Sequence, residues 1–318
     1  MFEKAKALVY LKANKLDLRD VEQLPMASGD VLVRTIATTI TPGIERLQFT
    51  GKSVTRKEIN FPIVSGSELV GEVLSVGAEV GTVQAGDYVF VSRADKWFDA
   101  ESLFGCQAEK VLTGGGNVLR LSRAPNDVDL LTGLLAYCLA AARKVDLSQV
   151  ERVLVLGLGS VGLMLAEVLR YKGVATIDAA EKFLVRGKLA AARDIAFDIE
   201  DFTSDYFDRY DLIIEATGRI GILEQATKFL KPQGRFLLLG NYEEMLYDYR
   251  LVQDKEPVMI SSAHSTAADL QEAAYLISIE ELPLKKFITH HFPIGDFKRA
   301  YDTALNAADA VKTVLMWQ

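Results

Sequence analysis

The chain has 318 residues, 49% hydrophobic and 25% charged, which is typical of a globular protein large enough for about two domains. Its net charge of −7 argues against nucleic acid as the main partner, because phosphate binding requires a basic face. The N-terminus lacks a signal-peptide pattern, and the apolar stretch 153–169 is too short and too rich in glycine for an integral membrane segment.

Short runs rich in β-branched residues, separated by glycine turns, dominate the first 120 residues. They predict strands at 5–10, 30–40, 70–76 and 87–92 and, together, a compact antiparallel barrel. An Ala/Leu-rich helix is then predicted from 126 to 145, after Pro125.

Strands and helices alternate from residue 151 onward, which predicts an α/β unit with a parallel sheet covered on both faces. The expected strands and helices, in chain order, are 153–156, 161–171, 175–179, 182–192, 194–198, 211–216, 220–230, 235–239 and 257–261. Two further helices, 269–277 and 296–306, precede a strand at 311–317. We expect this last strand to return to the N-terminal barrel.

A glycine turn follows the first strand of this second part. Gly157, Gly159 and Gly162 form a G-x-G-x-x-G pattern that includes Ser160 and Val161 and opens directly into a helix. The glycines allow a tight turn, approach of the backbone to a pyrophosphate, and close packing of helix and strand, while the helix N-terminus favours phosphate. The pattern predicts dinucleotide binding; the competing interpretation is a tight β–α turn in a buried sheet.

An acidic residue stands at the end of the next predicted strand. Glu181 lies 19 residues beyond Gly162, where a carboxylate accepts hydrogen bonds from the adenosine ribose and repels a 2′-phosphate. This favours NAD over NADP. Asp178 is a competing candidate, Lys182 and Arg186 could accept a phosphate, and Glu181 could instead cap the following helix.

Cys106 and Cys138 are the only cysteines in the sequence. Two thiols in a chain of this length give no disulfide framework and favour a reducing, cytoplasmic location.

These parts together resemble the medium-chain dehydrogenase/reductase superfamily. The resemblance rests on the glycine turn and on motifs at 66–71, 86–89, 136–137, 215–218 and 239–240. It implies a GroES-like β-barrel catalytic domain at 1–125 and 265–318 and a Rossmann doubly wound parallel sheet at 126–264. It also implies that Thr217, Gly218 and Gly240 contact the cofactor, and relatives often pair as homodimers through the sheet edge.

The chain departs from the zinc-dependent members of that superfamily. Thr41, Ser67 and approximately Leu131 occupy the places of the Cys, His and Cys ligands of the catalytic metal, and none is a good zinc ligand. The four-cysteine structural lobe is also missing, since 92–104 contains no cysteine. We therefore expect a zinc-free enzyme with no bound metal.

A narrower resemblance is carried by the segments 41–47, 61–68 and 102–105. They look like the 3-hydroxyethyl bacteriochlorophyllide a dehydrogenase family, whose members oxidise a 1-hydroxyethyl substituent of a bacteriochlorin to acetyl with NAD. The chain has Ser67 where that family usually has Tyr, and Cys106 where it commonly has a second Gly. The small-molecule substrate implied is a bacteriochlorin pigment. Aromatic residues on N-terminal loops, such as Trp97 and Phe98, could line its pocket or pack the barrel.

Without a metal, side chains or water must remove the hydroxyl proton and hold the forming carbonyl oxygen. The hydroxyls of Thr41 and Ser67 are expected to orient the alcohol or a water, and Glu68 or Glu45 to relay a proton. Glu45 could instead form an ion pair or cap a helix. His264, just past the last predicted Rossmann strand, is a candidate base or a surface histidine.

Two other functions remain open from the sequence. A zinc-free quinone or enone reductase would usually prefer NADPH. A nucleotide-binding protein without catalytic activity is the other alternative, because the fold alone does not define a function.

Overall fold

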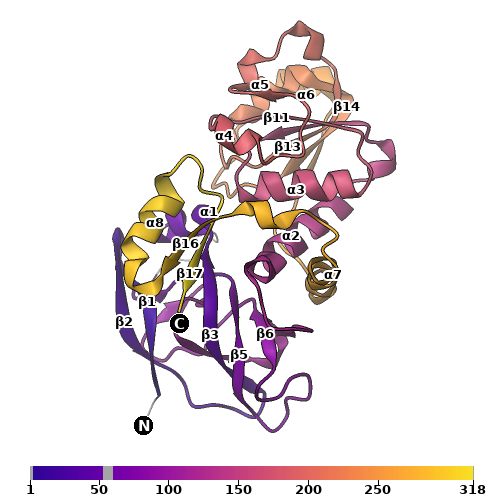
Figure 1. Cartoon of the computed structure of the whole chain (residues 1–318). Coiled ribbons are helices and arrows are strands. Elements are labelled where there is room, and N and C mark those ends of the chain that lie inside the picture. The colour runs from indigo at the N-terminus through magenta and orange to yellow at the C-terminus, as the bar shows by residue number, and fades with distance from the viewer. Residues whose placement is uncertain (1–2, 53–59, 318) are drawn as a thin grey trace. The chain divides into compact units, whose positions relative to one another are not determined.

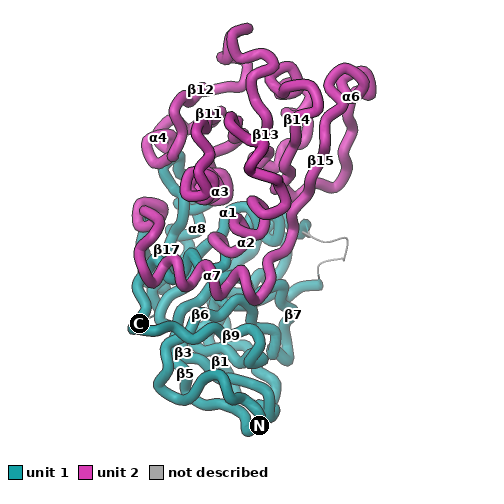
Figure 2. The backbone as a smooth tube through the Cα atoms, turned by 90° about the vertical axis from the view of Figure 1, so that its right-hand side faces the viewer, with its two compact units in different colours: residues 1–133, 288–318 teal, residues 134–287 magenta. Residues whose placement is uncertain are grey.

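The computed structural model describes residues 3–52 and 60–317. The chain forms two compact units: one contains residues up to Gly133 and from Ile288 onward, and the other contains Leu134–Phe287. Figure 2 shows them in teal and magenta. The boundaries differ from the predicted 125/126 and 264/265. The second difference has a physical cause, because Asp269 of the helix after residue 265 accepts a hydrogen bond from Arg143 inside the second unit.

Two sheets build the first unit. A seven-stranded sheet has the order β16-β17-β3-β5-β6-β9 with β8 also paired to β3, and a four-stranded sheet has the order β2-β1-β4-β7. The bounds are β1 Lys4–Lys12, β2 Lys15–Glu22, β3 Asp30–Ile40, β4 Ile63–Val64, β5 Leu69–Val76, β6 Tyr88–Val91, β7 Glu101–Ser102, β8 Lys110–Gly114, β9 Val118–Arg120, β16 Ile288–Pro293 and β17 Lys312–Met316.

The central strand β3 explains why the C-terminus returns to this unit. It pairs antiparallel with β5 on one side and with β17 on the other, with Thr313 opposite Ile40. In Figure 1 the yellow β17 lies beside the indigo β3, which confirms the predicted return of the last strand. All but the final residue of β17 are buried, as expected for a strand covered on both faces.

Valine and alanine side chains from both sheets fill the core of the first unit, with buried Leu69, Trp97 and Cys106. Helices α1 (Pro42–Phe49) and α8 (Phe297–Asn306) belong to the same unit. A second apolar cluster joins Phe297 and Tyr301 of α8 to Leu8 and Tyr10 of β1. This cluster packs the C-terminal helix against the first strand.

The second unit is a six-stranded parallel sheet in the order β12-β11-β10-β13-β14-β15, as the alternation of strands and helices predicts. Its strands are β10 Arg152–Leu156, β11 Thr176–Ala180, β12 Ile195–Ala196, β13 Tyr210–Glu215, β14 Leu230–Leu238 and β15 Val258–Ser261. Its helices are α3 Ser160–Tyr171, α4 Leu184–Gly187, α5 Ile222–Ala226, α6 Tyr249–Lys255 and α7 Ala267–Ser278. Helix α2 (Thr132–Arg143) begins at the boundary between the units.

Three predicted helices are shorter in the structure. The helix expected at 126–145 is Thr132–Arg143, preceded by a 3₁₀ segment, Asp127–Leu131. The helix expected at 182–192 is only Leu184–Gly187, and the one expected at 220–230 is Ile222–Ala226 followed by a 3₁₀ turn, Thr227–Phe229. A cause for the early end of the helix Leu184–Gly187 lies at Gly187, where an added Cβ would lie 2.9 Å from Ile195 Cδ1. This close approach to β12 occurs where the helix ends. Sequence periodicity also missed the helix α6 and several strands, among them β2, β8, β9 and β16.

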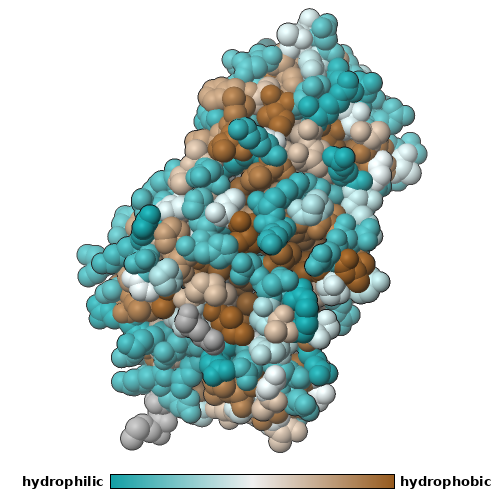
Figure 3. Space-filling view, viewed as in Figure 1, coloured by the Kyte–Doolittle hydropathy of each residue, from teal (hydrophilic) through white to brown (hydrophobic). Residues whose placement is uncertain are grey.

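No helix among the described residues is long and apolar enough to span a membrane. On the face shown in Figure 3, hydrophobic residues occur in groups among hydrophilic ones. Exposed apolar side chains include Val258 on the edge strand β15 (50% exposed) and Leu246 (81%). The homodimer expected from the resemblance stays a prediction.

Candidate active site

The glycine turn between β10 and α3 has the geometry that a dinucleotide requires. Gly157 has a φ of +89°, and an added Cβ at Gly162 would lie 1.9 Å from the carbonyl oxygen of Gly157, so both positions exclude larger residues. At Gly159 an added Cβ would meet nothing within 4 Å. The space above Gly159 is therefore open, and the backbone there is accessible to a pyrophosphate. Ser160 and Val161 form the first turn of α3, whose free N–H groups favour an anion.

Glu181 follows β11 and contacts this turn directly. Its carboxylate is largely buried and accepts hydrogen bonds from the amides of Leu158 (2.6 Å) and Phe183 (2.8 Å). Asp178, the competing candidate, lies within β11 and accepts a hydrogen bond from Tyr210 (2.8 Å) inside the unit. Of the two carboxylates, Glu181 is therefore the one that lies against the glycine turn.

We expect Glu181→Gln to weaken NAD binding roughly tenfold and to reduce the preference for NAD over NADP. An amide offers one acceptor oxygen, so one of the two backbone N–H groups loses its partner, at a cost of about 1–3 kcal/mol. Fluorescence titration with NADH and NADPH measures both effects, with the exposed Glu200→Gln as control. An unchanged ratio of the two affinities would show that Glu181 only supports the turn.

Two further predicted cofactor contacts lie at strand ends of the same sheet. Thr217 donates its amide and its hydroxyl to Glu215 at the end of β13, and its methyl would be 2.8 Å from a Cβ at Gly157. Gly218, next in the chain, has a φ of +73°. Burial raises the pKa of Glu215, and the Thr217 hydrogen bonds oppose that shift. Thr217 therefore packs against the glycine turn and is anchored by a buried carboxyl.

Gly240 follows β14 and the loop residue 239. Its amide donates to the hydroxyl of Tyr242 (3.1 Å), and that ring leaves no room for a Cβ at Gly240. Tyr137 of α2 donates to the carbonyl of Ser262 (2.9 Å), just after β15. The motifs around 136–137 and 239–240 thus fix the carboxyl ends of neighbouring strands, where ligands bind in sheets of this kind.

In the first unit, three of the predicted catalytic residues lie together. The Thr41 and Ser67 hydroxyls are 3.0 Å apart, and both residues are partly exposed. Glu68 is buried and accepts a hydrogen bond from Thr39 (2.5 Å). Lys312 of β17 joins them: its ammonium donates to Thr41 (2.9 Å) and pairs with Glu68.

Lys312 was missed by the sequence reasoning. Its side chain has no exposed surface, and its ammonium also lies 3.5 Å from Thr39 Oγ1. A lysine is rarely fully buried unless it is paired, so the full burial of Lys312 indicates a specific role for its charge. The sequence feature that could have identified Lys312 is its position inside the apolar run 310–316, because a charged residue is unusual in a buried strand.

This cluster does not fit a catalytic zinc ion. Hydroxyls at positions 41 and 67 are poor zinc ligands, and a divalent cation beside Thr41 would face the ammonium of Lys312. Leu131 is buried and apolar. Within residues 3–52 and 60–317, no group of three or more His, Cys, Asp or Glu side chains could hold a metal.

Glu45 lies in a separate, buried cluster. Its carboxyl accepts hydrogen bonds from Tyr10, from Tyr301 (3.4 Å) and from the amide of Gly66 (3.1 Å), next to Ser67. Burial raises the pKa of Glu45 to about 7, although the Tyr10 hydrogen bond opposes the shift. Tyr301 also donates to Gln107 (2.9 Å). Glu45 therefore anchors the segment that carries Ser67 and Glu68; a role in proton transfer stays a prediction.

His264, the fifth predicted catalytic residue, is exposed in the loop between β15 and α7. It belongs to the second unit, whereas the other four belong to the first. Its role as a base therefore stays a prediction.

The N-terminal residues considered for a substrate pocket fall into two groups. Trp97 is buried and its indole donates to the carbonyl of Ala94 (3.2 Å), so it packs the barrel core. Phe98 is 54% exposed. Lys96 pairs with Asp30 (3.3 Å) and Arg93 with Asp95 (3.2 Å). Both cations are therefore already paired with neighbouring carboxylates.

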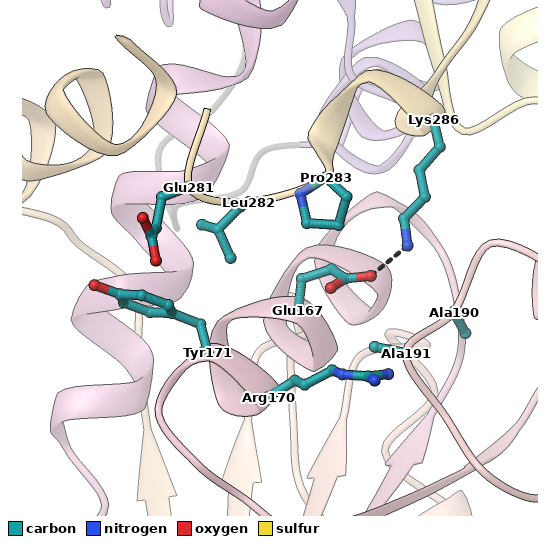
Figure 4. A pocket seen from close by; sticks show the side chains of 9 residues that line it. All are labelled: Glu167, Arg170, Tyr171, Ala190, Ala191, Glu281, Leu282, Pro283 and Lys286. Carbon is teal, nitrogen blue, oxygen red and sulfur yellow. Dashed lines mark hydrogen bonds and ion pairs between the residues drawn. The ribbon is translucent and has the colours of Figure 1, made fainter. Parts of the chain in front are cut away.

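A surface pocket of about 370 Å³ lies elsewhere in the second unit, between the end of α3 and the loop after α7. Figure 4 shows Lys286 reaching toward Glu167 there, and the two form an ion pair. Arg170 and Glu281 add one charge of each sign, so the pocket has no net preference for an anion or a cation. It contains none of the predicted site residues.

Comparison with known proteins assigns both units. Residues 27–133 match the alcohol dehydrogenase GroES-like domain, and residues 136–317, more than half of the chain, match the glucose dehydrogenase C-terminus. The 2-desacetyl-2-hydroxyethyl bacteriochlorophyllide A dehydrogenase of Rhodobacter capsulatus is 27% identical over 295 residues, which cover 91% of each chain.

Solved structures agree on the fold. A short chain alcohol dehydrogenase from Escherichia coli CFT073, complexed with NADH, superposes with a TM-score of 0.84 at 20% identity over 99% of both chains. A dehydrogenase from Sinorhizobium meliloti 1021 bound to NADP gives a TM-score of 0.82 at 18% identity, covering 99% of this chain and 100% of that one. The motifs, the two units and the family matches together place this chain in the medium-chain dehydrogenase family.

Proposed function

We propose that this protein oxidises the 3-(1-hydroxyethyl) group of a bacteriochlorophyllide to a 3-acetyl group, with NAD as hydride acceptor and without zinc. The observation that carries the substrate is the 27% identity to a bacteriochlorophyllide dehydrogenase over 91% of both chains. The family match supports the coarser statement that the chain is an oxidoreductase acting on alcohols.

The residues of the second unit support a nicotinamide dinucleotide as cofactor. The open space at Gly159 would admit the pyrophosphate to the N-terminus of α3, and Glu181 would accept the ribose hydroxyls beside it. When bound, NAD accepts the hydride from the carbinol carbon. Thr217, Gly218 and Gly240, at or near the carboxyl ends of β13 and β14, would line the remaining length of the cofactor.

The residues of the first unit support an alcohol site without a metal. The Thr41 and Ser67 hydroxyls are partly exposed and would orient the substrate alcohol, because the metal ligands of the zinc-dependent members are replaced there. Glu68 and Glu45 are buried behind them and fix the segment around Ser67. The charges beside the alcohol would then be those of Lys312 and Glu68, in place of a metal ion.

An absorption assay tests this proposal. The protein is incubated with NAD and 3-(1-hydroxyethyl) bacteriochlorophyllide a, and we expect the long-wavelength band to shift as the new acetyl group conjugates with the ring. NADP in place of NAD should give much slower turnover, and removal of metal by a chelator should leave the rate unchanged.

Other outcomes would identify another function. NADPH-dependent reduction of a quinone or an enone, with no reaction of the pigment, would show a reductase of a different class. Cofactor binding without hydride transfer to any alcohol or carbonyl compound would show a protein that only binds the nucleotide. Stoichiometric, tightly held zinc would refute the metal-free site.

A further inference from the structure

Lys312 belongs to the cluster that Thr41, Ser67 and Glu68 form in the first unit. The proposed oxidation assigns no step to this lysine. Its side chain is fully buried in β17, and its ammonium contacts Glu68, Thr41 and Thr39. Burying a charge in this way is costly unless it is paired and hydrogen-bonded. Glu68 supplies the counter-charge, and Thr39 also donates to Glu68, which holds the carboxylate in place.

The direction of the hydrogen bonds follows from the chemistry of the ammonium. An ammonium has three donors and no acceptor, so Thr41 Oγ1 must accept from Lys312. Thr41 Oγ1 keeps a second lone pair, so either hydroxyl can donate across the 3.0 Å that separates it from Ser67 Oγ. We adopt the arrangement in which Thr41 donates, because that arrangement directs the Ser67 proton away from Thr41 and toward a bound substrate. The chain of hydrogen bonds therefore runs from Lys312 through Thr41 to Ser67, and Ser67, which is partly exposed, is its donor end.

We propose that the Lys312 ammonium takes the electrostatic place of the missing metal, by polarising Thr41 and Ser67 so that the Ser67 hydroxyl holds the substrate oxygen. Lys312 is thus a positioning residue and Ser67 the group that contacts the substrate. A hydrogen bond strengthens when its donor is itself polarised by a buried charge, and a fixed donor aimed at a developing negative oxygen lowers the barrier.

The step balances without a metal. The O–H bond of the alcohol breaks and its proton passes to water, while Ser67 stabilises the oxygen. The C–H bond breaks, its hydrogen and electron pair would leave together as a hydride for the nicotinamide of bound NAD, and the carbon–oxygen double bond forms. Lys312 and Glu68 keep their protonation states throughout. This inference rests on the proposed alcohol oxidation, but it does not depend on the pigment being the substrate.

The critical test compares Lys312→Met with the double variant Lys312→Met/Glu68→Gln. The single variant leaves a carboxylate buried without a cation and is expected to be unstable. The double variant removes both charges and should fold. If the lysine only neutralises Glu68, the double variant will keep the wild-type kcat. We expect instead a kcat at least about 100-fold lower, with the Kd for NAD within about threefold of wild type.

Two variants control this experiment. Lys312→Arg keeps the positive charge and should recover part of the lost kcat. Lys286→Met removes another lysine that is paired with a buried glutamate, outside the site, and should leave kcat unchanged. A wild-type kcat in the double variant would overturn the proposal. A Kd for NAD raised more than tenfold, with kcat retained at saturation, would make Lys312 a cofactor anchor and also overturn it.

A spectroscopic measurement separates this inference from the choice of substrate. Acetophenone and 1-phenylethanol carry the same acetyl and 1-hydroxyethyl groups on a simple aromatic ring. Infrared difference spectra of ¹³C-labelled acetophenone, bound with NAD, should show a carbonyl stretch at lower wavenumber in wild type than in the double variant or in Ser67→Ala. Equal wavenumbers would overturn the role of Lys312, whereas turnover of 1-phenylethanol without turnover of the pigment would refute only the proposed substrate.

Discussion

Replacing Gly159 by valine should weaken NAD binding by about 10- to 100-fold while leaving the melting temperature unchanged. An added Cβ at this position meets no other atom within 4 Å, and the φ of −70° is accessible to any residue. The substitution should therefore not destabilise the fold. The same open space is where the pyrophosphate must approach the backbone, and a side chain would block it. Isothermal titration with NADH and thermal unfolding measure the two quantities on one sample.

Gly162→Ala, in contrast, should destabilise the fold. Its Cβ would lie 1.9 Å from the carbonyl oxygen of Gly157, so the backbone of the turn must move, and we expect a loss of about 2–4 kcal/mol in the free energy of unfolding. Gly221→Ala in the same unit, where an added Cβ also meets nothing within 4 Å, is the matched control and should change neither quantity. If Gly159→Val bound NADH normally, the turn would not be the pyrophosphate site.

Between pH 5 and pH 8 the wild-type protein should lose up to about 3 kcal/mol of unfolding free energy through Glu45. The pKa of this buried carboxyl is raised from 4.5 to about 7 in the folded state, and each unit is worth about 1.4 kcal/mol. Below pH 4.5 the folded and unfolded states both hold the proton. Between the two pKa values only the folded state holds it, so stability falls as the pH rises and the full loss is reached above pH 7.

Urea unfolding at several pH values measures this loss, and Glu45→Gln should remove its pH dependence. Tyr10→Phe provides a second, independent variant. The Tyr10 hydrogen bond lowers the Glu45 pKa, so its removal should move the loss of stability to higher pH. A wild-type profile parallel to that of Glu45→Gln from pH 5 to pH 8 would contradict the assignment.

Glu45 also links stability to the candidate site. It accepts the amide of Gly66, whose φ is +90° and whose missing Cβ would lie 2.2 Å from the Gln107 side chain. The segment 65–68 is thus held on both sides, by a buried carboxyl and by close packing against Gln107. Ser67 and Glu68 owe their positions to this support.

Local sequence patterns were enough to predict the order of the two units, the parallel sheet and the glycine turn. These features depend on local patterns: a period of two or 3.6 residues, and glycines at fixed offsets that only a tight turn explains. The motif resemblance to medium-chain dehydrogenases is confirmed by the family matches. The predicted return of the last strand to the N-terminal barrel is also confirmed, and the structure identifies β3 as its partner there.

Which polar groups meet depends on how distant elements pack. Lys312 reaches Glu68 and Thr41 because β17 pairs with β3, although Lys312 and Thr41 are 271 positions apart in the sequence. Glu45 meets Tyr301 because α8 packs against β1. No local pattern encodes such pairs, since each depends on the register and packing of elements far apart in the sequence. The end of the short helix Leu184–Gly187 has the same kind of cause, because β12 lies against Gly187 there.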